Sequence, residues 1–337
     1  MICLYKERDI FKNGFTNVLN FAFTNVVYLV RKLNVTCKHK KQTKKLMKSI
    51  NLFFFIATLS LIYGCSSNKQ ADEKSNISLK NDMTVRDDFQ SYFDSCGVEG
   101  SIAIYDIESQ KWIVSDTVGL VIETLPASTF KIINLLIALE TTTIKDENEI
   151  VKWVGSTDTV KYGYRPEIYH DMSVKEAFEL SAGWVFVELA KKMGKDTYKK
   201  YLTESKYGNN NLTQTEADFW NFGDFAISPK NQVEFLHALY DDKLPFSKRN
   251  IDIVKRVMIT DQTEEYTIRA KTGWTRENNT NTGWWTGYIE TKKGTYIFAT
   301  RLLQDRKMNR SDFGSCRKEI TKKVFKDLGI IEQNASR

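Results

Sequence analysis

The sequence predicts an α+β fold (an α/β-type sandwich), in which helices pack against an antiparallel β-sheet formed by N- and C-terminal segments of the domain. Strand-like segments occur at 98–118 and again at 266–303. Between them, 145–260 is mostly helical in pattern, which indicates an inserted helical region. With 42% hydrophobic and 12% aromatic residues, the 337-residue chain has enough apolar side chains for a substantial core.

Residues 47–64 have the pattern of a secretory signal, with a short basic start, an apolar run from Ile50 to Tyr63, and a Gly-Cys end. The run is too short for a comfortable membrane span, and its end is similar to a bacterial lipoprotein signal. We therefore expect Cys65 to become the lipidated N-terminus; an uncleaved anchor is the alternative. Residues 1–46 are expected to be an upstream extension outside the mature protein, with translation starting at Met47.

The polar stretch 65–84 is short of large apolar groups and predicts a flexible tether. One domain is expected at 85–335. Together these segments predict a periplasmic protein of the bacterial cell envelope, which contacts the membrane through its lipid anchor only.

The net charge of +7 does not indicate nucleic-acid binding, because it is unevenly distributed. Residues 1–64 hold 11 of the 49 Lys and Arg residues but 2 of the 42 Asp and Glu residues. The remaining 38 basic and 40 acidic residues give a net charge of −2. No basic stripe remains there to follow a phosphate backbone.

The first predicted elements are a β-hairpin, at 98–109 and 111–118, and a helix from Ser128. The helix is apolar on all sides, which is typical of a central, buried helix. Ser173 and Glu176 have capping-box spacing and predict a helix start. A helix over 185–193 is expected to end at Gly194, and Ser228-Pro229 predicts another helix start.

The C-terminal part predicts three strands and a closing helix. The strands are expected at 266–274, 283–290 and 294–303, with Trp284 and Trp285 packing the sheet. The helix is expected over 317–328, before Gly329.

Ser128 and Lys131 are three residues apart on a helix, so their side chains face the same way. A serine hydroxyl becomes a useful nucleophile only when a base takes its proton. Two histidines lie beyond the leader: His237 is within an apolar helix, and His170 has no acidic partner pattern around it. A Ser-His-Asp triad is thus poorly supported, and Lys131 is the nearest available base.

Ser-x-x-Lys alone is a weak signal, and Lys-x-Gly also occurs at 161–163. The ordered set is stronger: Ser128 and Lys131 open a buried helix, Ser181 follows near a helix start, and Lys271-Thr272-Gly273 lies on a strand. Gly273 is expected to let substrate lie against the backbone. The set matches the signature of penicillin-recognising serine enzymes.

The resemblance extends to PASTFKI, KYGN, FW, NQVEFL, AKTGW, GWWTGY and CRKEI. In this order and spacing, from about residue 98 to 331, these segments resemble the class D (oxacillinase-type) β-lactamases of the penicillin-binding, transpeptidase-like superfamily. The resemblance implies hydrolysis of β-lactam antibiotics through an acyl-serine intermediate. The expected partner is a small-molecule β-lactam, and no metal or organic cofactor is expected.

The resemblance also implies catalytic roles for four residues. Ser128 is the nucleophile, and Lys131 is the base, carrying a carboxyl group derived from CO2. Ser181 relays a proton toward the leaving nitrogen, and Trp220 donates to the lysine's carboxyl group. Burial would lower the pKa of Lys131, leaving a neutral amine that reacts with CO2, and an indole N–H could donate to the resulting anion.

Substrate binding is implied for the segment from Lys271 to Trp274 and for Arg317. Lys271, Thr272 and Arg317 would hold the substrate's carboxylate beside Gly273. The backbone N–H groups of Ser128 and Trp274 would form the oxyanion hole.

One segment departs from the family's pattern. The family usually has serine, any residue and then valine, whereas here the run is Ser181-Ala182-Gly183-Trp184. Gly183 removes an apolar side chain that helps cover the lysine, and Trp184 is a candidate to refill the gap. We expect weaker retention of the carbamate.

Other readings follow from the same residues. Cys96 and Cys316 remain after lipidation of Cys65; a bridge between them is an open alternative, and no spacing indicates a zinc site. The chain could instead be a penicillin-binding or β-lactam-sensor protein that is acylated but deacylates slowly, or a surface lipoprotein that binds ligand without chemistry. Either a monomer or a homodimer is expected.

Overall fold

The computed structural model describes residues 82–308 and 311–332, and all of these fall within one compact unit. The predicted extension at 1–46, the signal at 47–64, Cys65 and most of the tether lie outside the described residues. Across the described ranges, none of the helices combines the length and the hydropathy needed to cross a membrane.

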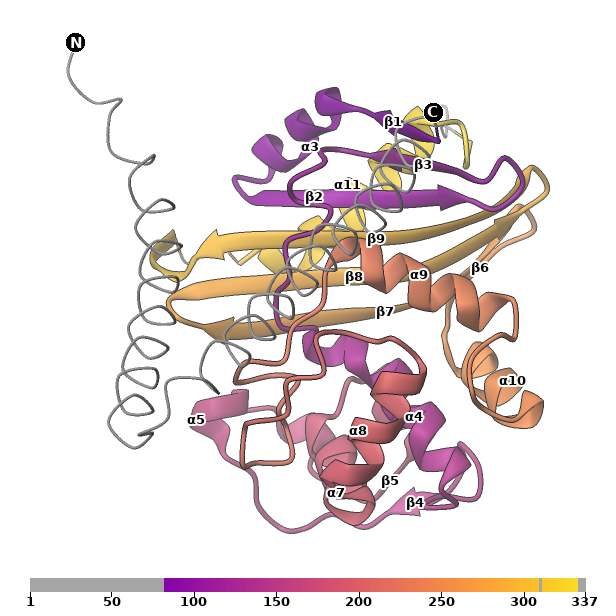
Figure 1. Cartoon of the computed structure of the whole chain (residues 1–337). Helices are drawn as coiled ribbons and strands as arrows, with labels where there is room; N and C mark the ends of the chain where they lie inside the picture. The colour runs from indigo at the N-terminus through magenta and orange to yellow at the C-terminus, as the bar shows by residue number, and fades with distance from the viewer. Residues whose placement is uncertain (1–81, 309–310, 333–337) are drawn as a thin grey trace, which may run out of the picture. The chain divides into compact units, whose positions relative to one another are not determined.

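A seven-stranded sheet forms the framework, in the order β1-β3-β2-β9-β8-β7-β6. Its neighbouring strands are antiparallel except for β1 and β3, which are parallel. Strand β2 lies beside β9, so the N- and C-terminal segments share one sheet, as predicted (Figure 1). The strands are β1 (Met83–Val85), β2 (Glu99–Asp106), β3 (Lys111–Val114), β6 (Ile259–Gln262), β7 (Tyr266–Glu277), β8 (Thr280–Thr291) and β9 (Gly294–Asp305).

The start of the sheet corrects the predicted end of the tether. Met83 and Thr84, assigned to the tether, pair with Trp112 and Ile113 of β3. These two residues therefore belong to a strand, because their backbone finds partners on β3, and β1 becomes the edge of the sheet beside it.

The helical region lies between β3 and β6, as predicted. It includes the small sheet of β4 (Ile150–Val151) and β5 (Met172–Ser173). The α-helices of the described chain are α3 (Gln90–Ser95), α4 (Lys131–Glu140), α5 (Thr159–Tyr162), α6 (Val174–Glu179), α7 (Gly183–Met193), α8 (Lys195–Glu204), α9 (Pro229–Tyr240), α10 (Lys248–Val257) and α11 (Phe313–Asp327). Short 3₁₀ turns are η1 (Asp87–Phe89), η2 (Ala127–Phe130), η3 (Pro166–Ile168) and η4 (Arg306–Met308).

The predicted helix ends are confirmed by their caps. Ser173 Oγ accepts a hydrogen bond from the backbone N–H of Glu176 at 3.1 Å, and α6 begins after it. Ser228 Oγ does the same for Asn231 at 3.2 Å before α9. Gly194 ends α7 with a positive φ of 76°, a conformation that glycine adopts without steric penalty.

Two hydrophobic clusters lie on opposite faces of the sheet. The larger joins α4, the helical region and α9 to residues such as Trp284 and Ile297. The smaller joins α3 and α11 to residues such as Trp285 and Phe298. Figure 1 shows α9 in front of the sheet and α11 behind it. Trp284 and Trp285 are adjacent on β8 and therefore point to opposite faces, and both are buried, as predicted.

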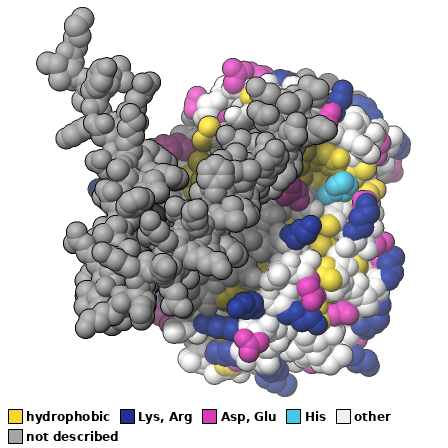
Figure 2. Space-filling model, viewed as in Figure 1, with side chains coloured by type: hydrophobic (Ala, Val, Ile, Leu, Met, Phe, Trp, Pro, Cys, Tyr) yellow, Lys and Arg dark blue, Asp and Glu magenta, His cyan; other side chains and the backbone are white. Residues whose placement is uncertain are grey.

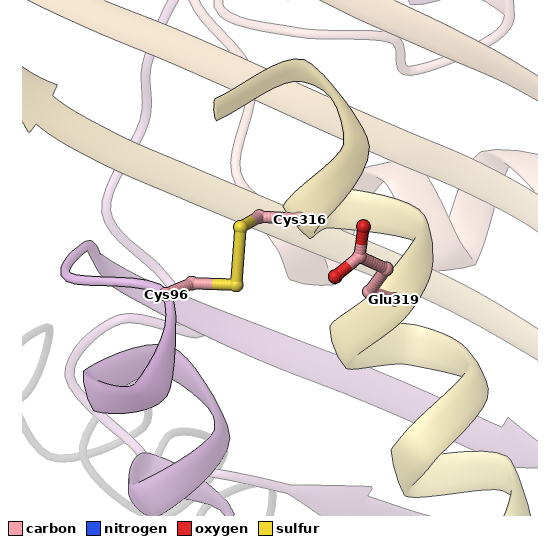
Figure 3. A group of neighbouring side chains, drawn as sticks. All are labelled: Cys96, Cys316 and Glu319. Atoms are coloured by element: carbon pink, nitrogen blue, oxygen red, sulfur yellow. A yellow bond between two sulfur atoms is a disulfide. The ribbon is translucent and has the colours of Figure 1, made fainter. Parts of the chain in front are cut away.

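A disulfide joins Cys96, just after α3, to Cys316 in α11, with a Cα–Cα distance of 6.2 Å (Figure 3). The sequence left this pairing open. Glu319 lies close to both sulfur atoms, but cysteines joined in a disulfide have no thiolate to offer, so these three residues are not a metal site. On the part of the surface visible in Figure 2, basic and acidic side chains are interspersed, which agrees with the balanced charge of the domain.

Candidate active site

The predicted nucleophile lies on a strained turn at the entry to α4. The helix begins as the 3₁₀ turn η2 and becomes α-helical at Lys131, so Ser128 is on the tighter turn. Ala127, just before it, has a positive φ of 51°, which is uncommon for a residue with a side chain. A 2.9 Å hydrogen bond from Ala127 N to Trp220 O holds the turn in place. Such strained backbone is concentrated at functional sites.

Lys131 is buried beneath this turn and contacts the nucleophile. A hydrogen bond of 2.8 Å joins its Nζ to Ser128 Oγ, while the side chain is 1% exposed. Burial, together with the nearby charge of Arg165, lowers the pKa of Lys131 to about 7. Among the described residues, no carboxylate forms an ion pair with this amine. A lysine so placed is substantially neutral at physiological pH and can accept a proton.

Trp220 packs against the same turn. Its ring stacks on Phe130 with a centroid distance of 4.9 Å and an angle of 7°, and it is fully buried. Its indole Nε1–H is buried and has no hydrogen-bond acceptor within the described part of the chain. A buried donor without an acceptor is costly, so this N–H suits an additional anionic or carbonyl oxygen.

Ser181 and Lys271 contact each other beside the same cavity. Lys271 Nζ lies 3.0 Å from Ser181 Oγ and 3.2 Å from the backbone oxygen of Thr272. Ser181 lies two residues before α7 and has a positive φ of 57°, a second strained residue at the site. Burial, followed by the charge of Lys131, lowers the pKa of Lys271 well below its ordinary value.

Gly273 has a structural reason in addition to the expected contact with substrate. A Cβ at this position would lie 2.8 Å from the carbonyl oxygen of Pro126 and 3.2 Å from Thr129 Cγ2. The missing side chain therefore allows β7 to approach the turn that carries Ser128. Gly273 also lines the cavity, and the expectation that substrate lies against its backbone stays a prediction.

Arg317 and Trp274 complete the β7 side of the site. An Arg317 N–H donates to the carbonyl oxygen of Gly273, and burial lowers the pKa of Arg317 to about 10. Trp274 is 37% exposed and donates to Asn281 Oδ1 at 3.2 Å. The predicted start of the last helix at 317 is late, because α11 begins at Phe313 and places Arg317 one turn inside it.

A cavity of about 520 Å³ brings most of the predicted residues together. Its lining includes the nucleophile, the base and the relay serine, together with the β7 and α11 residues. These are Ser128, Lys131, Ser181, Thr272, Gly273, Trp274 and Arg317. Lys271 and Trp220 lie behind the lining and reach the site through Ser181 and through the η2 turn.

Gly183, where the sequence departs from the family's pattern, also lines the cavity. Apart from its chain neighbours, no atom lies within 4 Å of where a Cβ would stand at Gly183, so a side chain would fit there. Trp184 also lines the cavity, but its indole N–H donates to Ile168 O at 2.7 Å, and its ring packs edge-on against Trp153.

Several cavity residues were missed by the sequence reasoning. They come from the segment around α5 and from the loop after Trp220, and are Lys161, Tyr162, Arg165, Asn221 and Phe222. No motif marks them. The only local signal was the Lys-x-Gly match at 161–163, which has the same form as the match at 271–273 and was set aside as a chance occurrence.

Comparison with known proteins gives a consistent result. Residues 103–326 match the family described as the penicillin binding protein transpeptidase domain. The chain is 35% identical over 260 residues to β-lactamase OXA-10 of Pseudomonas aeruginosa, covering 76% of this chain and 94% of that one. It is 37% identical over 207 residues to β-lactamase OXA-48 of Klebsiella pneumoniae, covering 61% and 75%.

Solved structures agree with this result. A class D β-lactamase from Sebaldella termitidis superposes with a TM-score of 0.70 at 40% identity, covering 74% of this chain and 99% of that one. FUS-1 (OXA-85), a class D β-lactamase from Fusobacterium nucleatum, superposes with a TM-score of 0.68 at 29% identity, covering 74% and 100%.

Proposed function

The chain belongs to the class D serine β-lactamases, and from that premise we propose how its own residues carry out the reaction and where it acts. It is a hydrolase that opens β-lactams through an acyl-serine intermediate. The observation that carries the proposed roles is the 2.8 Å contact between Ser128 Oγ and the buried Lys131 Nζ, whose pKa is lowered to about 7.

Acylation begins with Ser128. Its oxygen attacks the lactam carbonyl while the base at Lys131 takes the hydroxyl proton. The backbone N–H groups of Ser128 and Trp274 are assigned to the oxyanion hole. Ser181 passes a proton to the lactam nitrogen as the ring C–N bond breaks. Its hydrogen bond to Lys271 supports this relay, because burial lowers the pKa of that lysine and leaves its amine more available as a proton acceptor for the serine hydroxyl.

The substrate's carboxylate is assigned to the β7 and α11 side of the cavity. Thr272 and Arg317 line it there, and Lys271 lies directly behind them. Arg317 has an Nε–H that is buried without a partner among residues 82–308 and 311–332, and its hydrogen bond to Gly273 O keeps the guanidinium against β7. A fixed, partly desolvated guanidinium favours a carboxylate over water.

We assign the CO2-derived carboxyl group to Lys131. The surroundings fit: the amine is neutral enough to react, and the Trp220 N–H is a buried donor without an acceptor in the described chain. When bound, the carboxyl group supplies an anionic base in place of an amine. Trp220 would hold it by donating from Nε1, and the apolar Phe186 ring, 5.2 Å from Lys131 Nζ, limits water there.

Retention of that group is proposed to be weaker than is usual in the family, because Gly183 leaves open space on the cavity wall beside the base. Turnover measured with and without added bicarbonate tests this. We expect activity to rise with bicarbonate in the wild type, and to depend on it less in Gly183→Val. Equal bicarbonate dependence in the two proteins would contradict the role of Gly183.

The experiment that tests the reaction is a turnover assay. The protein is mixed with a chromogenic β-lactam in bicarbonate, and product is followed beyond one equivalent of enzyme. Continued release is expected; a burst of one equivalent followed by none would indicate a slowly deacylating penicillin-binding or sensor protein. Ser128→Ala should abolish both the acyl-enzyme mass and product formation, whereas a protein that only binds ligand would be unaffected.

We also propose that the enzyme is a lipoprotein held at the periplasmic membrane through Cys65. The signal-like run at 47–64 supports this, and so does the Cys96–Cys316 disulfide, because disulfides persist in oxidising compartments. Labelling with a radioactive fatty acid should mark the wild type and not Cys65→Ala. Size-exclusion chromatography of a chain lacking residues 1–65 would decide between a monomer and a homodimer.

A further inference from the structure

A buried carboxylate, Asp218, contacts two residues of the cavity wall and has no part in the proposed reaction steps. Asp218, two residues before Trp220, is 1% exposed. Its Oδ2 accepts a hydrogen bond from the Tyr162 hydroxyl and lies 3.0 Å from Lys161 Nζ. Lys161 also pairs with the exposed Glu216. We call Lys161, Tyr162 and Asp218 the latch.

The latch holds α5, the part of the cavity wall with few other contacts. Residues 163–165 are attached separately, because the Tyr169 hydroxyl donates to Gly163 O at 3.3 Å and an Arg165 N–H donates to Leu180 O at 3.0 Å. Thr157 and residues 161–165 line the cavity, yet α5, which precedes most of them, buries no residue of its own. Val160 is 97% exposed. Gly155 and Gly163, on either side of α5, have positive φ values of 84° and 81° and open space around them.

Lys161 and Tyr162 therefore fix the α5 part of this wall. Besides their contacts with Asp218, both contact Phe222: Lys161 Nζ lies 4.5 Å from its ring centroid, and the Tyr162 ring meets it edge-on at 5.8 Å. A helix of four residues is not stable alone, so these side chains supply most of its attachment to the body.

Asp218 is in turn fixed relative to the nucleophile. Its backbone oxygen accepts from Asn221 N at 2.9 Å, and Trp220 O between them accepts from Ala127 N at 2.9 Å. The latch is thus connected through one short segment to the turn that carries Ser128. A buried carboxylate requires such partners, because an unpaired charge in the interior is strongly unfavourable. Its Oδ1 is buried and has no partner within the described chain, so the pairs with Lys161 and Tyr162 carry the whole compensation.

The wall lies where one part of a β-lactam must go. In a penicillin the carboxylate and the acylamino substituent project from opposite sides of the fused rings. With the carboxylate assigned to Arg317 and Thr272 and the carbonyl to Ser128, we assign the acylamino side chain to the wall formed by residues 161–165, which line the same cavity.

We propose that Asp218 is a positioning residue for β-lactam hydrolysis, which holds Lys161 and Tyr162 so that residues 161–165 form the binding wall for the substrate's acylamino side chain. This rests on the substrate orientation given under the proposed function. Loss of the latch weakens binding of substrates that reach the wall and spares substrates that do not.

The test compares two substrates on Asp218→Asn. One is a penicillin with a bulky aromatic acylamino group; the other is 6-aminopenicillanic acid, which has the same nucleus and carboxylate but no acyl group. We expect KM for the first to rise about tenfold, as for loss of a charge-assisted hydrogen bond, with kcat within about threefold. KM for the second should change less than about twofold. An equal rise for both substrates, or a change in melting temperature alone, would overturn the proposal.

Two further variants keep the test decisive if Asp218→Asn folds poorly. Tyr162→Phe removes one hydrogen bond and keeps the ring on Phe222; the same selective rise in KM, of about threefold, is expected. Asp242→Asn is the matched control, because Asp242 pairs with Lys255 at 2.7 Å outside this cavity; neither KM should change. If the wild type turns over neither substrate, the proposed function fails; if it turns over both and the variants lack the selectivity, the latch alone fails.

Discussion

In two regions of one cavity, the surroundings shift the pKa of a lysine in opposite directions. Lys131 and Lys271, which we call the floor lysines, are buried beside Ser128 and Ser181. Within the described residues they have no carboxylate partner, and burial lowers the pKa of both. In the latch, burial alone would also lower the pKa of Lys161, but hydrogen bonds to Glu216 and Asp218 together raise it. The direction of the pKa shift is decided by the presence of carboxylate partners and not by burial alone.

The opposite pKa shifts correspond to two roles: proton transfer at Lys131 and attachment of the cavity wall at Lys161. A buried lysine without a counter-ion has a lowered pKa, and at a pKa of about 7 a large fraction of Lys131 is neutral and can accept a proton. A lysine held between two carboxylates stays charged over the whole physiological range and works as a fixed cation. The two Lys-x-Gly segments, 161–163 and 271–273, show how the same three-residue pattern serves either purpose according to what surrounds it.

The largest effect is expected from removing the floor lysine. Lys131→Ala should lower kcat by about 10³-fold or more, since general-base catalysis contributes on that scale. Lys161→Met should lower kcat by less than about tenfold, because its role is attachment. Steady-state hydrolysis of a chromogenic β-lactam measures both. Similar losses in the two variants would remove the distinction between the regions.

A pH series sharpens the comparison through the floor lysine's pKa of about 7. Carboxylation consumes the neutral amine and CO2 and releases one proton to solvent, and below the amine's pKa a second proton must first leave the ammonium. The CO2 concentration for half-maximal activity should therefore fall about tenfold per pH unit above pH 7, and more steeply, toward a hundredfold per unit, below it. Rates are measured at fixed dissolved CO2 from pH 5.5 to 8.5. A half-saturation point independent of pH would contradict a carboxylated Lys131.

Removing the carboxylates of Glu216 and Asp218 should lower the pKa of Lys161, as burial does for Lys131 and Lys271. In Glu216→Gln/Asp218→Asn the burial of Lys161 is no longer offset, so its pKa should fall. Its amine should then react several-fold faster with an acylating reagent at pH 8, quantified by mass spectrometry of the peptide containing Lys161. Lys248→Met/Asp252→Asn, which changes an exposed ion pair on α10, is the control and should leave labelling of Lys161 unaltered.

The smallest effect on activity is expected from removing the Cys96–Cys316 disulfide. Cys316→Ser should lower the free energy of unfolding by about 2–4 kcal/mol, measured by denaturant titration with and without reductant. The kcat should change by less than about threefold, because hydrogen bonding to Gly273 still positions Arg317. A collapse of kcat with unchanged stability would place the cross-link among the groups that position the substrate.

Much of the fold was predictable because its signals are local. Ser173, Ser228 and Gly194 indicate helix ends within a few residues, and the strand-like segments at 266–274, 283–290 and 294–303 predict β7, β8 and β9. The nucleophile and base were predictable for the same reason, since three residues separate them. The 3₁₀ geometry of η2 was not, because it depends on the hydrogen bond between Ala127 and Trp220.

The rest of the site depends on contacts that no local pattern encodes. Tyr162 and Asp218 are 56 residues apart in sequence, and Lys271 and Ser181 are 90 apart. The reason for Gly273 lies in the approach of Pro126 from another element. Family resemblance supplied the Lys271 and Ser181 roles, but it offered no guide to Asp218, which is part of no motif in the chain.

The Cys96–Cys316 bond has one more consequence. It closes a covalent ring, and every residue lining the catalytic cavity lies inside that ring except Arg317, the next residue after it. A protease that cuts once in the exposed stretch around Val160 therefore releases no fragment: the two pieces separate on a gel only after reduction. A nicked molecule keeps the nucleophile and the carboxylate-binding arginine on the same covalent body.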